Sequence, residues 1–174
     1  MDMQTTLEVS GLSISFGGLK AADNMSLTVN QGEITALIGP NGAGKTTAMR
    51  MLCGLLSPTS GEGEVAGFDI YRQANKIKEN IGYMSQKFSL YEDLTTVENL
   101  ELFGGIYGMS KKAIREKTTE VVSELGLQSE QKLLVASLPL GIKQKVSFAV
   151  STFHSPKIVF LDEPTGGVDP MARR

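Results

Sequence analysis

The sequence predicts an α/β fold in which a mixed β-sheet is interrupted by a helical insertion at about residues 88–150. Short apolar runs separated by glycines fill the first forty residues, as is typical of strands and tight turns. From about residue 88 to residue 149 the apolar residues recur at helical spacing. A compact apolar run then returns at residues 158–161, which indicates a further buried strand.

Length and composition describe an ordinary globular chain. Its 174 residues suit one domain, and 41% hydrophobic with 21% charged residues argue against wholesale disorder. The net charge of −2 provides no direct signal for nucleic-acid binding. The single cysteine, Cys53, excludes an internal disulfide and is expected to be an inert core residue. No apolar run approaches membrane-spanning length and the start lacks a secretory signal, so we expect a cytosolic chain.

The predicted elements follow from where the apolar runs and turn residues fall. Strands are expected at residues 7–9, 12–16, 25–29, 34–38, 62–66, 81–84 and 158–161. The run at 34–38 is compact and ends at a glycine, so we expect that strand to be buried on both faces. Helices are expected at 45–56, at 71–80, from Thr95 or Thr96 to a stop near residues 104–105, from Ser110 to Gly126, and from Pro139 to about residue 149.

A glycine-rich loop between the strand at 34–38 and the next helix carries the strongest chemical signal. Residues 39–46, GPNGAGKT, fit the pattern G-x-x-x-x-G-K-[ST] at every fixed position and in the required strand–loop–helix context. Glycines allow such a loop to turn successive N–H groups toward phosphate oxygens, and the helix N-terminus adds unpaired donors. Lys45 would reach the β- and γ-phosphates and the Thr46 hydroxyl would bind Mg²⁺. The pattern predicts a nucleoside triphosphate site without specifying the base.

Two carboxylates follow the apolar run at 158–161. A buried strand would deliver Asp162 and Glu163 to the carboxyl edge of the sheet, where open α/β folds bind ligands. Asp162 suits a Mg²⁺ ligand, and Glu163 suits a base that orients and deprotonates an attacking water. A small-molecule kinase or GTPase shares the loop but requires neither this adjacent pair nor the helical insertion.

With both motifs in place, nearly the whole chain resembles the nucleotide-binding domain of an ATP-binding cassette (ABC) protein. Phe16 lies where that family stacks an aromatic ring on adenine, and Gln86 lies at its glutamine switch. Residues 161–165 match the acidic motif, and residues 166–169 resemble the dimer-contact loop. The resemblance implies a P-loop NTPase (RecA-like) core with an N-terminal antiparallel β-subdomain and an inserted α-helical subdomain.

The resemblance also implies domain bounds and site roles. Residues 1–87 would form the β-subdomain and the first part of the core, 88–150 the helical subdomain, and 151–174 the second part of the core. The implied cofactors are ATP and Mg²⁺. The implied site residues are, for catalysis, Lys45, Gln86 and Glu163; for nucleotide binding, Phe16, Gly39, Asn41, Gly42, Ala43, Gly44, Lys45, Thr46, Thr47 and Gly141; and for metal binding, Thr46, Gln86 and Asp162.

The signature sequence departs from the family pattern. The family usually has LSGGxxQ, whereas residues 138–144 read LPLGIKQ. Pro139 offers neither a hydroxyl nor an N–H, and Leu140 stands at a glycine position, so Gly141 and a helix N-terminus remain for the γ-phosphate. Either the site is weakened, or this is a working subfamily form similar to signatures of exporter-type and ribosome-associated cassettes. We favour the second interpretation.

The family resemblance implies partners. A second ABC nucleotide-binding domain would complete the ATP site in a homo- or heterodimer, and a transmembrane permease domain or subunit would hold the chain at the inner or plasma membrane. Residues 88–91 would line the groove for that partner or fill the core of the insertion. The leading function is ATP hydrolysis that drives multidrug or export-type transport. The alternatives are a soluble, ribosome-associated multi-cassette ATPase and an ATP-binding fragment without activity of its own.

The family's histidine switch would fall near position 194, beyond Arg174, so the sequence resembles a domain truncated at its C-terminus. We therefore expect the chain by itself to bind ATP·Mg²⁺ weakly and to hydrolyse it slowly or not at all. His154, the only histidine, precedes the acidic strand and is expected to be a helix-end residue.

Overall fold

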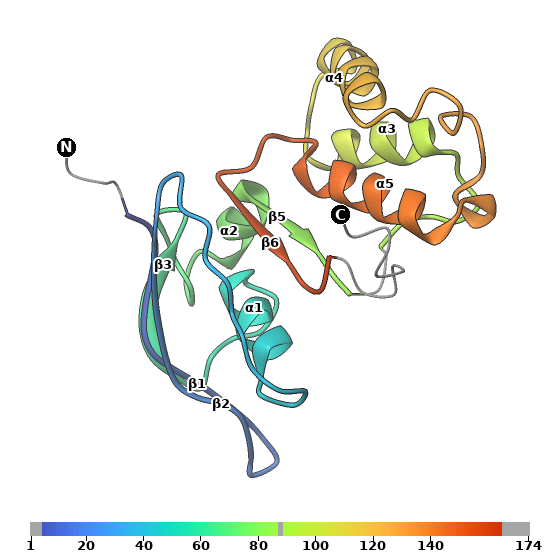
Figure 1. Cartoon of the computed structure of the whole chain (residues 1–174). Coiled ribbons are helices and arrows are strands. Elements are labelled where there is room, and N and C mark those ends of the chain that lie inside the picture. Colours follow the sequence, from blue (N-terminus) through green and yellow to red (C-terminus); the bar gives the residue numbers. More distant parts are fainter. Residues whose placement is uncertain (1–4, 87–88, 165–174) are drawn as a thin grey trace. The chain divides into compact units, whose positions relative to one another are not determined.

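The computed structural model describes residues 5–86 and 89–164, and the chain divides into two compact units, Met1–Ile81 and Gly82–Arg174 (Figure 1). The predicted dimer-contact loop at 166–169 lies outside the described residues, as does Phe88. Within the described ranges, no helix combines the length and apolarity needed to cross a membrane.

The first unit is built on a four-stranded antiparallel sheet. Its strands are β1 (Thr5–Phe16), β2 (Leu19–Asn30), β3 (Ser60–Val65) and β4 (Phe68–Asp69), in the order β2-β1-β3-β4. Apolar residues on one face of β1 are buried, from Leu7 and Val9 to Leu12 and Ile14. This alternation is what a strand with one covered face requires. The expected antiparallel β-subdomain is therefore present.

Strand β1 joins two runs, 7–9 and 12–16, that were predicted as separate strands. The pairing register with β2 shifts between Val9 and Leu12, and Gly11 between them has a φ of 64°. A bulge of this kind bends and twists a strand without ending it. Glycine in the middle of the run therefore marks an irregularity in one strand and not a turn between two.

Both helices of the first unit are shorter than the sequence predicts. Helix α1 (Lys45–Leu52) ends before residue 56 because Gly54 turns the chain with a φ of 67°. Helix α2 (Ala74–Asn80) begins three residues late. The Asp69 carboxylate accepts the N–H groups of Arg72 and Tyr71, which forms a turn there instead of a helix. These two bonds, that from Arg72 first, lower the pKa of Asp69.

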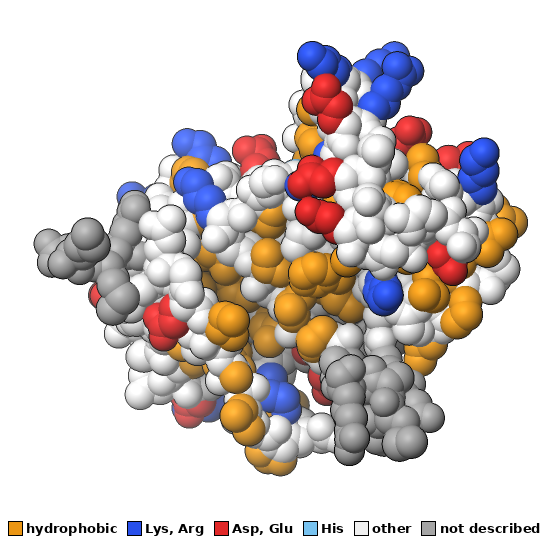
Figure 2. Space-filling model, turned by 45° about the horizontal axis from the view of Figure 1, so that its top comes forward, with side chains coloured by type: hydrophobic (Ala, Val, Ile, Leu, Met, Phe, Trp, Pro, Cys, Tyr) orange, Lys and Arg blue, Asp and Glu red, His pale blue; other side chains and the backbone are white. Residues whose placement is uncertain are grey.

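The predicted strand at residues 34–38 does not form. Its backbone joins no sheet in the described part of the first unit, and Ile34 and Ile38 are 99% and 93% exposed. Figure 2 shows hydrophobic side chains at the surface of the molecule. A strand needs a neighbour to pair its backbone N–H and C=O groups. The apolar pattern identified a segment suited to a buried strand, but the pattern alone does not provide the neighbour.

The second unit combines a strand pair with three helices. Strands β5 (Ile81–Met84) and β6 (Ile158–Leu161) pair and run side by side in the same direction (Figure 1). Helix α3 (Thr96–Ile106) packs against both α4 (Lys111–Glu124) and α5 (Leu140–Thr152). A 3₁₀ turn, η1 (Val135–Ser137), precedes α5. The cluster of buried hydrophobic residues among the helices is aliphatic except for Phe153, which is 1% exposed. The predicted helical insertion is therefore present.

Three predictions about the ends of the second unit's helices can be compared with the structure. Helix α3 continues through Gly104 and Gly105, where it was predicted to stop. Pro139 is the N-cap of α5 and not its first residue, and α5 extends beyond residue 149. His154 follows the end of α5, as expected, and its ring stacks on Tyr107 with the centroids 3.6 Å apart.

Close packing explains why α3 has a glycine at position 104. A Cβ there would lie 2.8 Å from Cε1 of Phe153 and 2.9 Å from Cγ1 of Ile114, both buried side chains. At Gly105 a Cβ would meet nothing within 4 Å. The two adjacent glycines therefore have different roles, because only the first allows α3 to approach α4 and the end of α5.

We expect Gly104→Ala to destabilise the protein and Gly105→Ala to stabilise it. Alanine gains about 0.5–1 kcal/mol over glycine in a helix interior, whereas overpacking a filled core costs about 1–3 kcal/mol. The measurement is urea-induced unfolding of both variants beside the unmodified protein. Equal effects of the two substitutions would contradict the packing role of Gly104.

Candidate nucleotide-binding site

The loop at residues 39–46 has the backbone conformation that a phosphate loop needs. Gly42 and Gly44 both have a φ of 84°, a region that other residues rarely adopt. A turn over residues 40–43, which contains Gly42, is closed by a bond from the Ala43 N–H to the Pro40 carbonyl, 3.2 Å long. Two left-handed glycines spaced in this way allow the loop's N–H groups to converge on an anion.

Helix α1 begins at Lys45, so the last two residues of the 39–46 segment are already helical. Gly44 is its N-cap and, having no side chain, makes no capping hydrogen bond to the first turn. The N–H groups at a helix start have no partner within the helix, and together with the helix dipole they attract anions. The residues present therefore fit a phosphate group of ATP.

Gly44 is also held close to β2. A Cβ at this position would overlap the Ala21 carbonyl oxygen, so only glycine allows the loop to lie against the strand. Gly42 has the same φ but open space around it. Gly42 is needed for its backbone conformation alone, whereas Gly44 is needed both for its conformation and for its close approach to β2.

The Lys45 side chain reaches back from the start of α1 to the first residues of the loop. Its ammonium group donates to the carbonyls of Gly39 and Pro40 at 2.7 and 2.8 Å. The ammonium group therefore lies beside the loop backbone, where the β- and γ-phosphates would bind. Phe16, at the end of β1, is 51% exposed, which leaves its ring available for stacking on a base.

The ends of β5 and β6 bring two predicted catalytic side chains together. The Asp162 N–H donates to the Met84 carbonyl at 2.9 Å, which extends the pairing past the strand ends. Just beyond the two strand ends, Gln86 Nε2 donates to Glu163 Oε2 at 2.9 Å. Glu163 has a φ of 54°, an uncommon conformation for a residue with a Cβ and one that is concentrated at functional sites. Sequence reasoning did not predict this bond or this backbone conformation.

The predicted Mg²⁺ ligands form an all-oxygen set. Thr46 provides a hydroxyl, Gln86 an amide oxygen and Asp162 a carboxylate, the donor types that Mg²⁺ binds. Asp162 is 4% exposed, as suits a carboxylate held for a cation. Across the part of the chain that the structure describes, no three His, Cys, Asp or Glu side chains gather to hold a metal by themselves. The metal set therefore stays a prediction.

The signature sequence lies at the start of α5. Leu138 is buried, Leu140 is exposed, and Gly141 lies in the first turn with open space around it. Pro139 forms no side-chain cap, so this helix start also has N–H groups available for an anion. Upstream, Leu90 packs on the helical core while Tyr91 is half exposed. Of the described part of this run, Leu90 therefore contributes to the core of the insertion.

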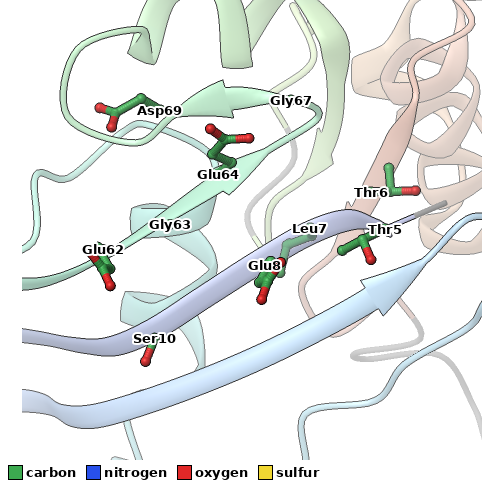
Figure 3. Close-up of a pocket in the computed structure, with 10 residues that line it drawn as sticks. All are labelled: Thr5, Thr6, Leu7, Glu8, Ser10, Glu62, Gly63, Glu64, Gly67 and Asp69. Carbon is green, nitrogen blue, oxygen red and sulfur yellow. The ribbon is translucent and has the colours of Figure 1, made fainter.

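Two surface depressions have linings that include none of these residues. One lies on the sheet of the first unit and is lined from β1, β3 and the turn into β4 (Figure 3). There Glu8 stands opposite Glu64, and Glu64 opposite Asp69, so like charges face each other across neighbouring strands. The other depression is lined by α3, α4 and Gln128 and Gln131. Neither contains a predicted site residue.

Fold and loop together define a nucleotide-binding domain of the P-loop class, and comparisons with known proteins identify the family. A family model described as ABC transporter matches residues 22–166, and the chain belongs to this family. It is 46% identical over 171 residues to the probable multidrug ABC transporter ATP-binding protein YbhF of Escherichia coli (strain K12). It is 39% identical over 169 residues to the bacitracin transport ATP-binding protein BcrA of Bacillus licheniformis.

These matches cover 98% and 97% of the chain but 30% and 54% of the two relatives, so the chain spans only part of their length. Among solved structures, the ATP binding subunit of an ABC transporter has a TM-score of 0.85 at 30% identity, over 96% of this chain and 70% of that one. The cbiO1 protein of Clostridium perfringens, part of the ABC transporter complex cbiONQ, has a TM-score of 0.84 at 26% identity, over 97% and 69% of the two chains. The predicted family and fold class are confirmed.

We expect Gly44→Ala to destabilise the protein more than Gly42→Ala does. Both substitutions force a side chain into a left-handed conformation, at about 1–2 kcal/mol. Only the first also pushes a Cβ against the Ala21 carbonyl, which must move. Thermal unfolding of the two variants measures the difference, and equal melting temperatures would show that the loop does not lie against β2 as described.

Proposed function

We propose that the chain binds ATP and Mg²⁺ and hydrolyses ATP as the nucleotide-binding domain of an export-type ABC transporter. The observation that carries this proposal is the loop at 39–46, whose left-handed glycines lead directly into an uncapped helix start. Membership of the family supports the ATPase activity. The names of the relatives, multidrug and bacitracin transport ATP-binding proteins, support export.

The described side chains divide the work. The loop N–H groups and the Lys45 ammonium hold the β- and γ-phosphates, and Phe16 offers a ring to the base. Mg²⁺, when bound by Thr46, Gln86 and Asp162, would neutralise phosphate charge. Glu163 accepts a proton from the attacking water, and Gln86, already bonded to the Glu163 carboxylate, positions that carboxylate.

The proposed partners complete the site and couple it to transport. A second nucleotide-binding domain would place its residues 138–144 against the γ-phosphate, with Gly141 and the start of α5 as donors. A transmembrane permease would hold the domain at the cytoplasmic face of the membrane. The cbiO1 neighbour comes from such a multi-subunit transporter complex, which supports this arrangement.

Lys45→Ala should weaken ATP binding by about ten- to a hundredfold, because one charge-assisted contact contributes about 1.5–3 kcal/mol. The matched control is Lys78→Ala, which removes an exposed lysine from α2 in the same unit. Isothermal titration with ATP and Mg²⁺ provides the measurement. An ATP affinity of Lys45→Ala equal to that of Lys78→Ala would refute the proposed phosphate site.

In the chain assembled with its proposed transporter partners, Glu163→Gln should lower the rate of ATP hydrolysis by about 10²–10⁴-fold and leave ATP affinity intact, because the amide cannot accept the water's proton. Glu124→Gln, at the exposed end of α4, is the control carboxylate and should change nothing. Phosphate release under saturating ATP measures the effect. Unchanged turnover in Glu163→Gln would remove this residue from the role of general base.

A further inference from the structure

Asn99, on the second turn of α3, is fully buried and its amide serves the segment 91–95 that precedes the helix. Oδ1 accepts the Tyr91 N–H at 2.9 Å. Nδ2 lies within bonding distance of three carbonyls, at 3.0 Å from those of Tyr91 and Thr95 and 3.4 Å from that of Leu94. A buried amide that meets both donors and acceptors of one short segment fixes the shape of that segment.

The segment so held is paired in turn with the chain that leads into the signature helix. The Ala136 N–H donates to the Glu92 carbonyl at 3.0 Å, and the Val135 N–H donates to the Leu94 carbonyl at 2.9 Å. The pairing continues with a bridge between Thr95 and Leu134. Residues 91–95 therefore lie against residues 134–136 through backbone bonds that do not depend on side-chain identity.

A side-chain contact joins the same segment to α5 itself. Lys143, within the signature sequence, forms an ion pair with Glu92, with Nζ and Oε1 3.0 Å apart. The Lys143 side chain is 17% exposed and the Glu92 side chain is 68% exposed, so solvent reaches the carboxylate and this pair contributes only modestly. At the other end, a capping box between Thr95 and Glu98 fixes the start of α3. Bonds from the N–H and the hydroxyl of Thr95 lower the pKa of Glu98.

We infer that Asn99 is a positioning residue that holds residues 91–95, residues 134–136 and the start of α5 as one rigid connection, which we term the Asn99 clamp. The chain enters the clamp shortly after Gln86, which bonds to Glu163, and leaves it at the signature residues 138–144. A displacement of residues 91–95 therefore moves the start of α5 with it. The consequence for catalysis rests on the proposed function, whereas the clamp itself does not.

Amide hydrogen exchange on the 174-residue chain without nucleotide tests the clamp directly. In Asn99→Leu, the Val135 and Ala136 amides should lose roughly tenfold or more protection relative to amides of α4, because the segment that pairs with them loses its fixed shape. Leu100→Ala, at the next and equally buried position of α3, is the matched control. It should lower protection evenly across α3, α4 and α5. Retained protection at Val135 and Ala136 in Asn99→Leu, or the same even loss as in the control, overturns the inference.

A variant on α5 tests whether this helix is linked to residues 91–95 or whether substitutions on it only lower the overall stability of the unit. Lys143→Met, made on α5, should lower the protection of the Tyr91 amide by about two- to fivefold, since a partly exposed ion pair contributes modestly. The control Lys145→Met lies on the same helix, and its Nζ contacts the Leu125 carbonyl instead of Glu92. Equal effects of the two variants on the Tyr91 amide overturn the link to α5.

ATP turnover then tests the link to catalysis. Asn99→Leu should lower kcat by roughly tenfold with the KM for ATP little changed, because the phosphate loop lies in the other unit of the chain. A matching rise in KM overturns the positioning role. The assay uses the chain assembled with its proposed transporter partners, because the chain by itself is expected to hydrolyse ATP slowly or not at all. If that unmodified assembly lacks turnover, the proposed function fails, and the exchange measurements still decide whether the clamp exists.

Discussion

The candidate site depends on a backbone constraint at Gly44. The residue adopts a φ of 84°, lies against the Ala21 carbonyl and serves as the N-cap of α1. Any larger residue would be strained by the conformation and would collide with β2. Because the cap has no side chain, the N–H groups at the start of α1 have no capping side chain to bond. Lys45 follows immediately, so one position sets both the direction of the helix and the place of its cation.

The second unit solves a different problem, that of holding an irregular segment in place. Residues 91–95 form neither helix nor strand, yet they lie beside a hydrophobic core in which unpaired backbone groups are costly. The buried amide of Asn99 satisfies several of these groups at once, and residues 135–136 satisfy others. Polar satisfaction of this kind selects one conformation of the segment. The same bonds connect residues 91–95 to the chain that leads into the signature helix.

The strand run at 34–38 shows where pattern reasoning stops. Its apolar composition is as clear as that of 158–161, yet only the latter pairs, because β5 lies beside it. The glycines of α3 make the same point for helices. Residues 104–105 have the composition of a helix stop, but contact with Phe153 and Ile114 favours glycine at 104 inside the helix. In both cases a residue distant in the sequence decides the outcome.

Residue patterns alone predict the glycine-rich loop, the acidic strand end, the helical insertion and the family. These features follow from local rules, since left-handed turns favour glycine, apolar residues recur at helical spacing, and phosphates and Mg²⁺ bind particular donor groups. The bond between Gln86 and Glu163, the ion pair of Lys143 with Glu92 and the bonds from Asn99 to residues 91–95 emerge only from the folded arrangement. Each of these contacts joins a side chain to a group that only the packing of the folded chain brings close to it. The spacing of apolar and polar residues in the sequence therefore does not predict these contacts.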